Sequence, residues 1–234
     1  MASDIFHNDY REFPYWWEAY QPASDELTDV PGKTQVAIIG AGYAGMATAI
    51  ELSKLGIEAV VLDADSPGYG ASTRSGGLVG GMASVKKPLV APMPPPDHVQ
   101  QMTSDAGDGL SLLERLIEEE NIECGWHKTG RFLGAWSKSD YRKMQADAEK
   151  LNQAGNADAY VVSPDQQKEE IGSDFYHGGL VTGEAGHLHP ALYFSGLLTA
   201  CRGRGVPVCA QAKVVSLKQG DGEWTVKTSR GELK

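Results

Sequence analysis

Short apolar runs alternate with helical and turn-rich segments in the first third of the chain. Residues 35–39 (QVAII) predict a buried strand. Apolar side chains at helical spacing predict a helix over residues 44–55, and Gly56 follows in the position that glycine favours after a helix. A second strand is expected over residues 57–62, ending at Asp63. The pattern indicates a strand, a helix and a second strand in close succession.

A proline-rich stretch separates this opening from a second group of periodic segments. Residues 88–97 hold five prolines, which we expect to exclude regular structure and to mark a boundary. Apolar residues at helical spacing from Val99 to Ile117 then predict a long helix. We predict a short strand at residues 130–136, a helix at residues 139–152 and a second short strand at residues 159–163. Residues 163–164 are predicted to be the N-cap and first turn of a short helix.

The C-terminal part of the chain changes pattern once more. Pro190 predicts the start of a helix that runs to about Cys201. Strands are expected at residues 206–209, 213–217 and 223–229, with a turn at residues 220–222 between the last two. Residues 232–234 read as the first half of another strand, so we expect the chain to be the N-terminal part of a longer protein.

The composition is that of an ordinary globular protein. The 234 residues are 41% hydrophobic and 22% charged, enough to bury a sizeable core. A formal net charge of -10 leaves no basic surplus to neutralise phosphates, which disfavours a nucleic-acid partner or an anionic membrane surface. The longest uncharged run, residues 36–50, is interrupted by glycines and is too short for a membrane helix.

Cysteine usage and the N-terminus indicate a compartment. Cys124, Cys201 and Cys209 are an odd number without C-x-x-C spacing, so neither a disulfide framework nor a zinc knuckle is indicated. The polar, acidic start of the chain lacks the features of a signal peptide. We therefore expect a cytoplasmic protein in a reducing environment.

The turn between the first predicted strand and helix carries candidate chemistry. Residues 40–45 read Gly-Ala-Gly-Tyr-Ala-Gly, the G-x-G-x-x-G pattern, after a strand and at the start of a helix. In that context the first glycine makes the turn, the second lets backbone approach a pyrophosphate, and the third allows tight contact between helix and strand. The amides and dipole of the helix N-terminus would hold the phosphate. A tight turn without a nucleotide is the alternative.

Asp63 narrows the choice of nucleotide. An acid at the end of the second strand, about 20 residues beyond the glycines, accepts hydrogen bonds from the ribose hydroxyls. Its charge would repel a 2′-phosphate, so NADP is disfavoured while FAD and NAD remain. A P-loop is excluded, because residues 32–34 (GKT) precede the strand and Leu27 stands where the first glycine should be.

A second glycine-rich segment, residues 66–81 (SPGYGASTRSGGLVGG), favours FAD. Its adjacent glycines Gly76 and Gly77 allow backbone to lie close to a large planar group. Its serines offer hydroxyls to phosphate or ribityl oxygens, and Arg74 supplies a cation. A flexible surface loop is the alternative for this segment.

Together these segments resemble the FAD-dependent oxidoreductases of the D-amino-acid-oxidase type, which include glycine and sarcosine oxidases. The resemblance covers nearly the whole chain, through residues 36–65, 68–81, 122–137, 186–208 and 212–217. Within the family, the gamma-glutamylputrescine-oxidase-like branch is the most similar, with the pattern G-x-x-A-S-x-R-N-G-G after the acid. This chain has Ser75 where that branch usually has asparagine, and Asp63 where glutamate is commoner.

The resemblance implies a fold and its boundaries. We expect an α/β chain in which a Rossmann-like FAD-binding domain is interleaved with an α+β substrate domain and truncated at the C-terminus. The family fold has a later strand carrying A-T-N or A-T-G and a C-terminal glycine-rich segment that closes over the flavin, and this sequence has neither. The expected segments are an N-terminal arm, an FAD-binding segment, a substrate or cap segment and a return to the FAD-binding domain, at residues 1–32, 33–87, 88–189 and 190–234.

The resemblance also implies chemistry. In such families the flavin takes a hydride onto its N5 atom from the carbon beside an amine, and the imine then hydrolyses. The substrate would be an amine or amino acid of the gamma-glutamylputrescine, glycine or sarcosine type, with O2 or a redox partner as electron acceptor. A non-catalytic dinucleotide-binding fragment, or a subunit that needs a partner chain, is the alternative, and an NAD-linked dehydrogenase is a third possibility.

The resemblance further implies which residues bind FAD. The backbone of Val214 would pair with the adenine ring. The implied cofactor-binding residues are Gly40, Ala41, Gly42, Tyr43, Ala44, Gly45, Asp63, Ala64, Ala71, Ser72, Arg74, Ser75, Gly76, Gly77 and Val214. Neither a catalytic residue nor a metal ligand is assigned, because no nucleophile-and-base motif is present and the flavin performs the chemistry.

Other chemistry-bearing residues have structural explanations. His187 and His189 could share one side of a strand and bind a metal, but Pro190 indicates a junction between strand and helix there. Candidates for the substrate pocket by composition alone are Arg131, Trp136 and Tyr193, and structural roles are favoured for each. The aromatic arm, residues 13–20 (FPYWWEAY), is expected to pack onto the domain rather than bind a ligand.

Overall fold

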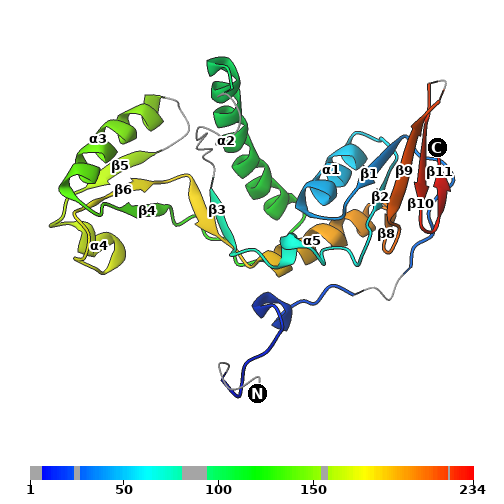
Figure 1. Ribbon diagram of the computed structural model, residues 1–234, viewed down its shortest axis with the longest axis horizontal. Coiled ribbons are helices and arrows are strands. Elements are labelled where there is room, and N and C mark those ends of the chain that lie inside the picture. Colours follow the sequence, from blue (N-terminus) through cyan, green and yellow to red (C-terminus); the bar gives the residue numbers. More distant parts are fainter. Residues whose placement is uncertain (1–6, 24–26, 81–93, 154–157, 221) are drawn as a thin grey trace, which may run out of the picture. The chain divides into compact units, whose positions relative to one another are not determined.

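Helices and strands alternate along the chain and assemble into two units (Figure 1). The computed structural model describes residues 7–23, 27–80, 94–153, 158–220 and 222–234. The first unit comprises residues 1–76, 122–124 and 189–234, and the second comprises residues 77–121 and 125–188. The chain therefore passes from one unit to the other several times, and both units mix helix with sheet.

The first unit is built on a three-stranded parallel sheet. β1 (Val36–Ile39), β2 (Ala59–Leu62) and β8 (Val208–Cys209) lie in the order β1-β2-β8. The helix α1 (Tyr43–Lys54) connects β1 to β2, and α5 (Pro190–Gly203) leads into β8. β2 is buried at all four positions, as expected for a parallel strand covered on both faces.

A second, antiparallel sheet packs against the parallel sheet. It consists of β9 (Val214–Gln219), β10 (Trp224–Thr228) and β11 (Gly231–Leu233), in the order β11-β10-β9. Figure 1 shows α1 and β9 on opposite sides of β1 and β2. The buried cluster that joins the two sheets consists of Val60, Leu62, Cys209, Ala212, Val226 and Leu233. Because alternate strand residues face opposite sides, the residue between Val60 and Leu62 faces the helices.

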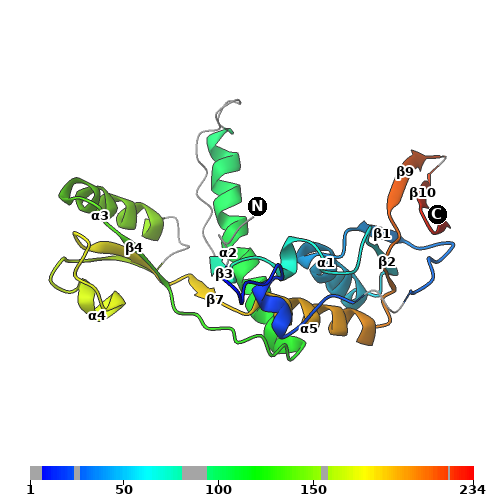
Figure 2. The same cartoon turned by 60° about the horizontal axis from the view of Figure 1, so that its bottom comes forward.

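Two short 3-10 helices bring distant parts of the first unit together. They are η1 (Tyr15–Glu18), in the aromatic arm, and η2 (Ala71–Thr73), in the second glycine-rich segment. Both lie beside α5, and Figure 2 shows η1 close to that helix. The arm and the second glycine-rich segment are therefore neighbours in space.

The second unit combines two antiparallel sheets with helices. Its elements are β3 (Leu78–Gly80), α2 (Pro96–Glu119), β4 (Arg131–Gly134), α3 (Lys138–Gln153), β5 (Ala159–Val162), α4 (Gln167–Ile171), β6 (Gly179–Thr182) and β7 (Ala185–His187). β5 and β4 flank β6 in one sheet, and β3 pairs with β7 in the other. A buried cluster of Ala148, Ala159 and Leu180 packs α3 onto the first of these sheets. Over the described residues, no helix has both the length and the hydrophobicity that crossing a bilayer requires.

The predicted elements of the first unit are present, with ends displaced by a few residues. Gly56 has φ of +71°, which agrees with its predicted place after α1. The strands expected on either side of residues 220–222 pair antiparallel, and the strand expected near the last residue is β11, which pairs with β10.

Two predictions about helix starts are wrong. Residues 88–97 do not exclude regular structure throughout, because α2 begins at Pro96, where a missing N–H costs no helical hydrogen bond. Residues 88–93 lie outside the described residues. Residues 163–164 do not start α4 either, because the helix begins at Gln167 with Gln166 as its N-cap, although the carbonyl of Ser163 already accepts from the N–H of Gln167.

Candidate functional site

The glycine turn joins β1 to α1 in a conformation that requires glycine at two positions. Gly40 has φ of +104°, which residues with side chains rarely adopt. Its N–H donates to the carbonyl of Leu62 at 2.8 Å, so the turn begins beside the end of β2. A Cβ on Gly45 would overlap the carbonyl oxygen of Gly40, so only glycine lets the helix lie this close to the strand.

Asp63 lies against this turn. Its Oδ2 accepts from the N–H of Ala41 at 2.6 Å, and its Oδ1 accepts from the N–H of Asp65 at 2.9 Å. A carboxylate has about four lone-pair sites, so each oxygen keeps capacity for another donor. The predicted pairing of the glycine turn with an acid is therefore present as a direct contact.

The second glycine-rich segment reaches the same turn. Ser72 Oγ accepts from the N–H of Tyr43, the first residue of α1, at 3.2 Å. A Cβ on Gly42, the N-cap of α1, would come within 3.1 Å of that same hydroxyl oxygen. The N–H of Gly68 donates to the carbonyl of Ala41 at 3.2 Å. The two segments that the sequence singles out thus meet at the N-terminus of α1.

Tyr43 contributes its main chain to this meeting point and its side chain to the packing behind it. Its hydroxyl donates to the carbonyl of Pro190 at 2.9 Å, and its ring lies 5.2 Å from that of Tyr193. Burial raises the pKa of both phenols well above the ordinary value of tyrosine. Both phenols are therefore neutral at physiological pH, and the Tyr43 hydroxyl acts as a donor that ties α1 to α5.

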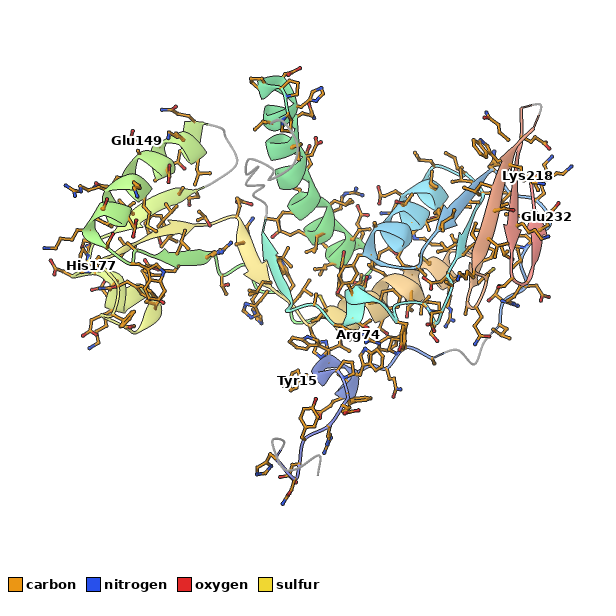
Figure 3. All side chains as sticks on the ribbon, viewed as in Figure 1. Tyr15, Arg74, Glu149, His177, Lys218 and Glu232 are labelled. Atoms are coloured by element: carbon orange, nitrogen blue, oxygen red, sulfur yellow. The ribbon has the colours of Figure 1, made fainter. Side chains whose placement is uncertain are left out.

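The guanidinium of Arg74 lies over two aromatic rings. Its carbon is 4.5 Å from the ring centroid of Trp17 and 4.4 Å from that of Tyr69. The sequence pattern indicates Arg74 as a cation of the site, but it indicates neither ring as a partner of Arg74. Trp17 comes from the aromatic arm, and only the fold brings it to this segment. Figure 3 labels Arg74 on the second glycine-rich segment and Tyr15 on the neighbouring arm.

The remaining predicted cofactor residues lie in both units. Val214 opens β9, two residues after Ala212, whose N–H donates to the carbonyl of Asp63 at 2.7 Å. Ala64 follows Asp63 in an exposed bend. Gly77 belongs to the second unit, where its carbonyl accepts from the N–H of Leu188 at 2.9 Å. In the first unit, the other residues lie in α1, in η2 and in the segment that follows η2, and they are Ala44, Ala71, Ser75 and Gly76.

The other candidates have packing partners. His189 caps α5, with Nδ1 accepting from the N–H of Leu192 at 3.2 Å, whereas His187 lies in β7 of the second unit. Tyr193 is buried in α5. Trp136, in the second unit, is 72% exposed and lies edge-on to the ring of Tyr176. Arg131 lies in β4, also in the second unit.

The arrangement defines a class of protein. A parallel strand, a glycine turn, a helix and a second strand ending in a carboxylate that contacts the turn are the parts of a dinucleotide-binding fold. Gly42 also suits such a ligand, because the absence of a Cβ leaves the main chain bare at the N-terminus of α1, beside the hydroxyl of Ser72.

Comparison with known proteins gives the family. Residues 35–234 match the DAO family of FAD dependent oxidoreductases, so the chain belongs to that family. It is 30% identical over 199 residues to the probable oxidoreductase OrdL of Haemophilus influenzae, covering 85% of this chain and 46% of that protein. It is 26% identical over 198 residues to the gamma-glutamylputrescine oxidoreductase of Escherichia coli, with the same two coverages, 85% and 46%.

A solved structure supports the fold. The glycine oxidase of Geobacillus kaustophilus superimposes with a TM-score of 0.70 at 19% identity, covering 87% of this chain and 53% of that one. The predicted α/β fold and membership of this family are thus confirmed. The chain spans about half the length of the curated relatives it matches.

Proposed function

We propose that this chain forms the nucleotide-binding part of an FAD-dependent oxidoreductase that oxidises the C–N bond of an amine or amino acid. The observation that carries the proposal is the meeting of the glycine turn, Asp63 and Ser72 at the N-terminus of α1. Family membership supports FAD as the dinucleotide. The names of the E. coli oxidoreductase and the Geobacillus oxidase support a substrate of the gamma-glutamylputrescine or glycine type, and sarcosine is the third candidate by its resemblance to glycine.

The residues at the turn would divide the binding of FAD among them. The first-turn amides of α1 and the Ser72 hydroxyl would face the diphosphate, where the helix dipole favours negative charge. Asp63 would accept from the adenosine ribose through its remaining lone pairs, and its charge disfavours a 2′-phosphate. Val214 would offer its backbone to the adenine. Bound FAD would supply the hydride acceptor for amine oxidation.

A cytoplasmic location, and O2 or a redox partner as electron acceptor, complete the proposal. The cysteines support the location, because all three are free thiols rather than disulfide-bonded, as suits a reducing compartment. The acceptor follows from the reaction, since a reduced flavin must pass its electrons on before another turnover.

The competing function is a non-catalytic dinucleotide-binding subunit that a partner chain completes. Its premise is the same glycine turn, because the contacts at the N-terminus of α1 concern binding of a dinucleotide and not the oxidation of a substrate. Both functions include a bound dinucleotide, so binding alone does not separate them.

Reduction of bound flavin separates the two functions. The intact gene product, purified with excess FAD, should retain a yellow chromophore. Its visible flavin band should bleach when gamma-glutamylputrescine, glycine or sarcosine is added without oxygen. Retained FAD that no amine or amino acid bleaches would favour the non-catalytic subunit. A protein that keeps no FAD would exclude the proposal.

A substitution at the turn tests the assigned site. Asp63→Asn should weaken FAD binding about 10-fold, because hydrogen bonds to a charged acceptor contribute about 1.5–3 kcal/mol. Asp65→Asn is the matched control, since its Oδ1 accepts only the local N–H of Ser66 among the contacts of the described residues. Equal FAD affinities for the two variants would remove Asp63 from the site.

A further inference from the structure

The aromatic arm contacts the second glycine-rich segment through two indole N–H groups. Trp17 Nε1 donates to Thr73 Oγ1 at 2.8 Å, and Trp16 Nε1 donates to the carbonyl of Ser75 at 2.7 Å. These partners lie 56 and 59 residues apart in sequence. Two adjacent tryptophans thus hold the segment on both sides of Arg74.

The Trp17 contact continues to the glycine turn. Thr73 is fully buried, and its hydroxyl donates to the carbonyl of Gly68 at 2.7 Å while it accepts from Trp17. Gly68 in turn donates its N–H to the carbonyl of Ala41 at 3.2 Å. Hydrogen bonds and the main chain of Gly68 therefore connect the arm, through the second segment, to the turn at the start of α1.

The arm also contacts Arg74. The ring centroids of Trp17 and Tyr69 are 5.8 Å apart with planes tilted by 51°, so the rings form an open notch rather than a parallel stack. The guanidinium carbon lies over both rings, so Trp17 of the arm and Tyr69 of the segment both attract this cation.

Trp16 joins the arm to α5 as well. Its ring lies 4.7 Å from that of His189, the N-cap residue of α5, with an interplanar angle of 68°. Tyr20, at the end of the arm, lies 6.3 Å from Phe194 of the same helix. The arm therefore packs against a helix of the first unit while Trp16 and Trp17 hydrogen-bond to the glycine-rich segment, and we call these two tryptophans with their contacts the clamp.

We propose that the aromatic arm is a positioning element of the FAD site, with Trp17 as its principal positioning residue. It holds Thr73 and Arg74 so that the second glycine-rich segment meets the N-terminus of α1 in a binding-competent arrangement. This inference rests on the proposed function, because it concerns binding of the same FAD. The apparent affinity for a ligand falls in proportion to the fraction of protein in the competent arrangement, so loosening the clamp must weaken FAD binding.

The first test measures the dissociation constant of FAD by fluorescence titration of the intact apoprotein. Trp17→Phe keeps an aromatic ring under Arg74 but removes the N–H, and should raise the constant about 5-fold. Trp17→Leu removes both contacts and should raise it about 30-fold. Trp224→Phe is the matched control, because Trp224 lies on β10 outside the clamp, and should bind FAD as the parent does.

A double-mutant cycle tests the hydrogen bond itself. Thr73→Val removes this bond and also the bond from the Thr73 hydroxyl to the carbonyl of Gly68, so it should raise the constant by more than about 5-fold. Adding Trp17→Phe to Thr73→Val should then change little, because the partner of the indole N–H is already absent. Thr73→Ser keeps the hydroxyl and should restore parental affinity. A role confined to fold stability would instead lower the apoprotein unfolding temperature and leave FAD affinity at low temperature unchanged.

The outcomes separate this inference from the proposed function. A parent protein that binds FAD, with Trp17→Phe and Trp17→Leu binding it equally well, would overturn the clamp alone. Independent effects of Trp17→Phe and Thr73→Val in the cycle would also overturn it. A parent protein that binds no FAD would overturn the proposed function and the clamp with it. Weaker binding by the clamp variants, with parental affinity in Thr73→Ser, would support the clamp.

Discussion

The two glycine-rich segments differ in what holds them. The first, residues 40–45, is fixed within the β1-α1-β2 unit, through the bond from Gly40 to Leu62 and the close approach of Gly45 to Gly40. The part of the second that lies in the first unit, residues 66–76, is held by side chains from the aromatic arm and from α5. Contacts within one strand-helix-strand unit thus determine the first segment, whereas contacts with more distant elements determine the second.

The largest effect is expected from a side chain at Gly45. Gly45→Val would place a Cβ on the carbonyl oxygen of Gly40, and backbone cannot move aside as a flexible side chain can. We expect destabilisation of about 4 kcal/mol, seen as a fall of about 10 °C or more in the thermal unfolding midpoint. Gly203→Ala, at the end of α5 where a Cβ meets open space, is the control and should change stability by less than about 0.5 kcal/mol. Similar midpoints for the two variants would contradict the steric account of the first segment.

A smaller effect is expected in the second segment. Gly68 has φ of +81°, and a Cβ there would overlap the ring of Phe194 in α5. Gly68→Ala should cost about 2–3 kcal/mol, because it combines backbone strain with a clash that a side-chain ring can partly relieve. Chemical denaturation of the parent and the variant measures the difference.

Gly70→Ala gives the matched control in the same segment. Gly70 lies two residues further on, with no atom within 4 Å of its Cβ position. We expect its stability to stay within about 0.5 kcal/mol of the parent. If Gly68→Ala proved equally mild, contact with α5 would not hold the second segment.

The difference between these two kinds of contact explains which parts of the site could be predicted from the sequence. Gly40, Gly45 and Asp63 follow from a local order of strand, turn, helix and strand, and the structure has them in contact as expected. The bond between Trp17 and Thr73 joins residues 56 positions apart, so no periodicity or motif could indicate it. A buried hydroxyl such as that of Thr73 needs a hydrogen-bond partner, but only the tertiary structure decides that this partner is the indole of Trp17.

Helix starts show the same limit on a smaller scale. Pro96 begins α2 although a run of prolines predicts irregular backbone, because proline at a first helical position loses no hydrogen bond. Ser163 and Pro164 are typical of a helix start, yet they lie in the turn before α4, which begins at Gln167 with Gln166 as its N-cap. Local propensity describes which residues suit a helix start, but it does not fix the position of the first helical residue to within a few residues.

The smallest effect tests the residue at which the two segments join. Tyr43→Phe removes the bond from the hydroxyl to the carbonyl of Pro190 and should cost about 1 kcal/mol at pH 7. Burial raises the pKa of Tyr43 in the folded protein, so the phenol contributes fully to stability below the unfolded pKa of about 10. Above that pH the parent loses up to about 1.4 kcal/mol per pH unit, because only its unfolded state ionises at this position. The two stabilities should therefore cross near about pH 11, which unfolding curves at several pH values can locate. Tyr15→Phe is the control, because Tyr15 is 73% exposed. If the free energies of unfolding of Tyr43→Phe and the parent stayed parallel through alkaline pH, the Tyr43 hydroxyl would be in water.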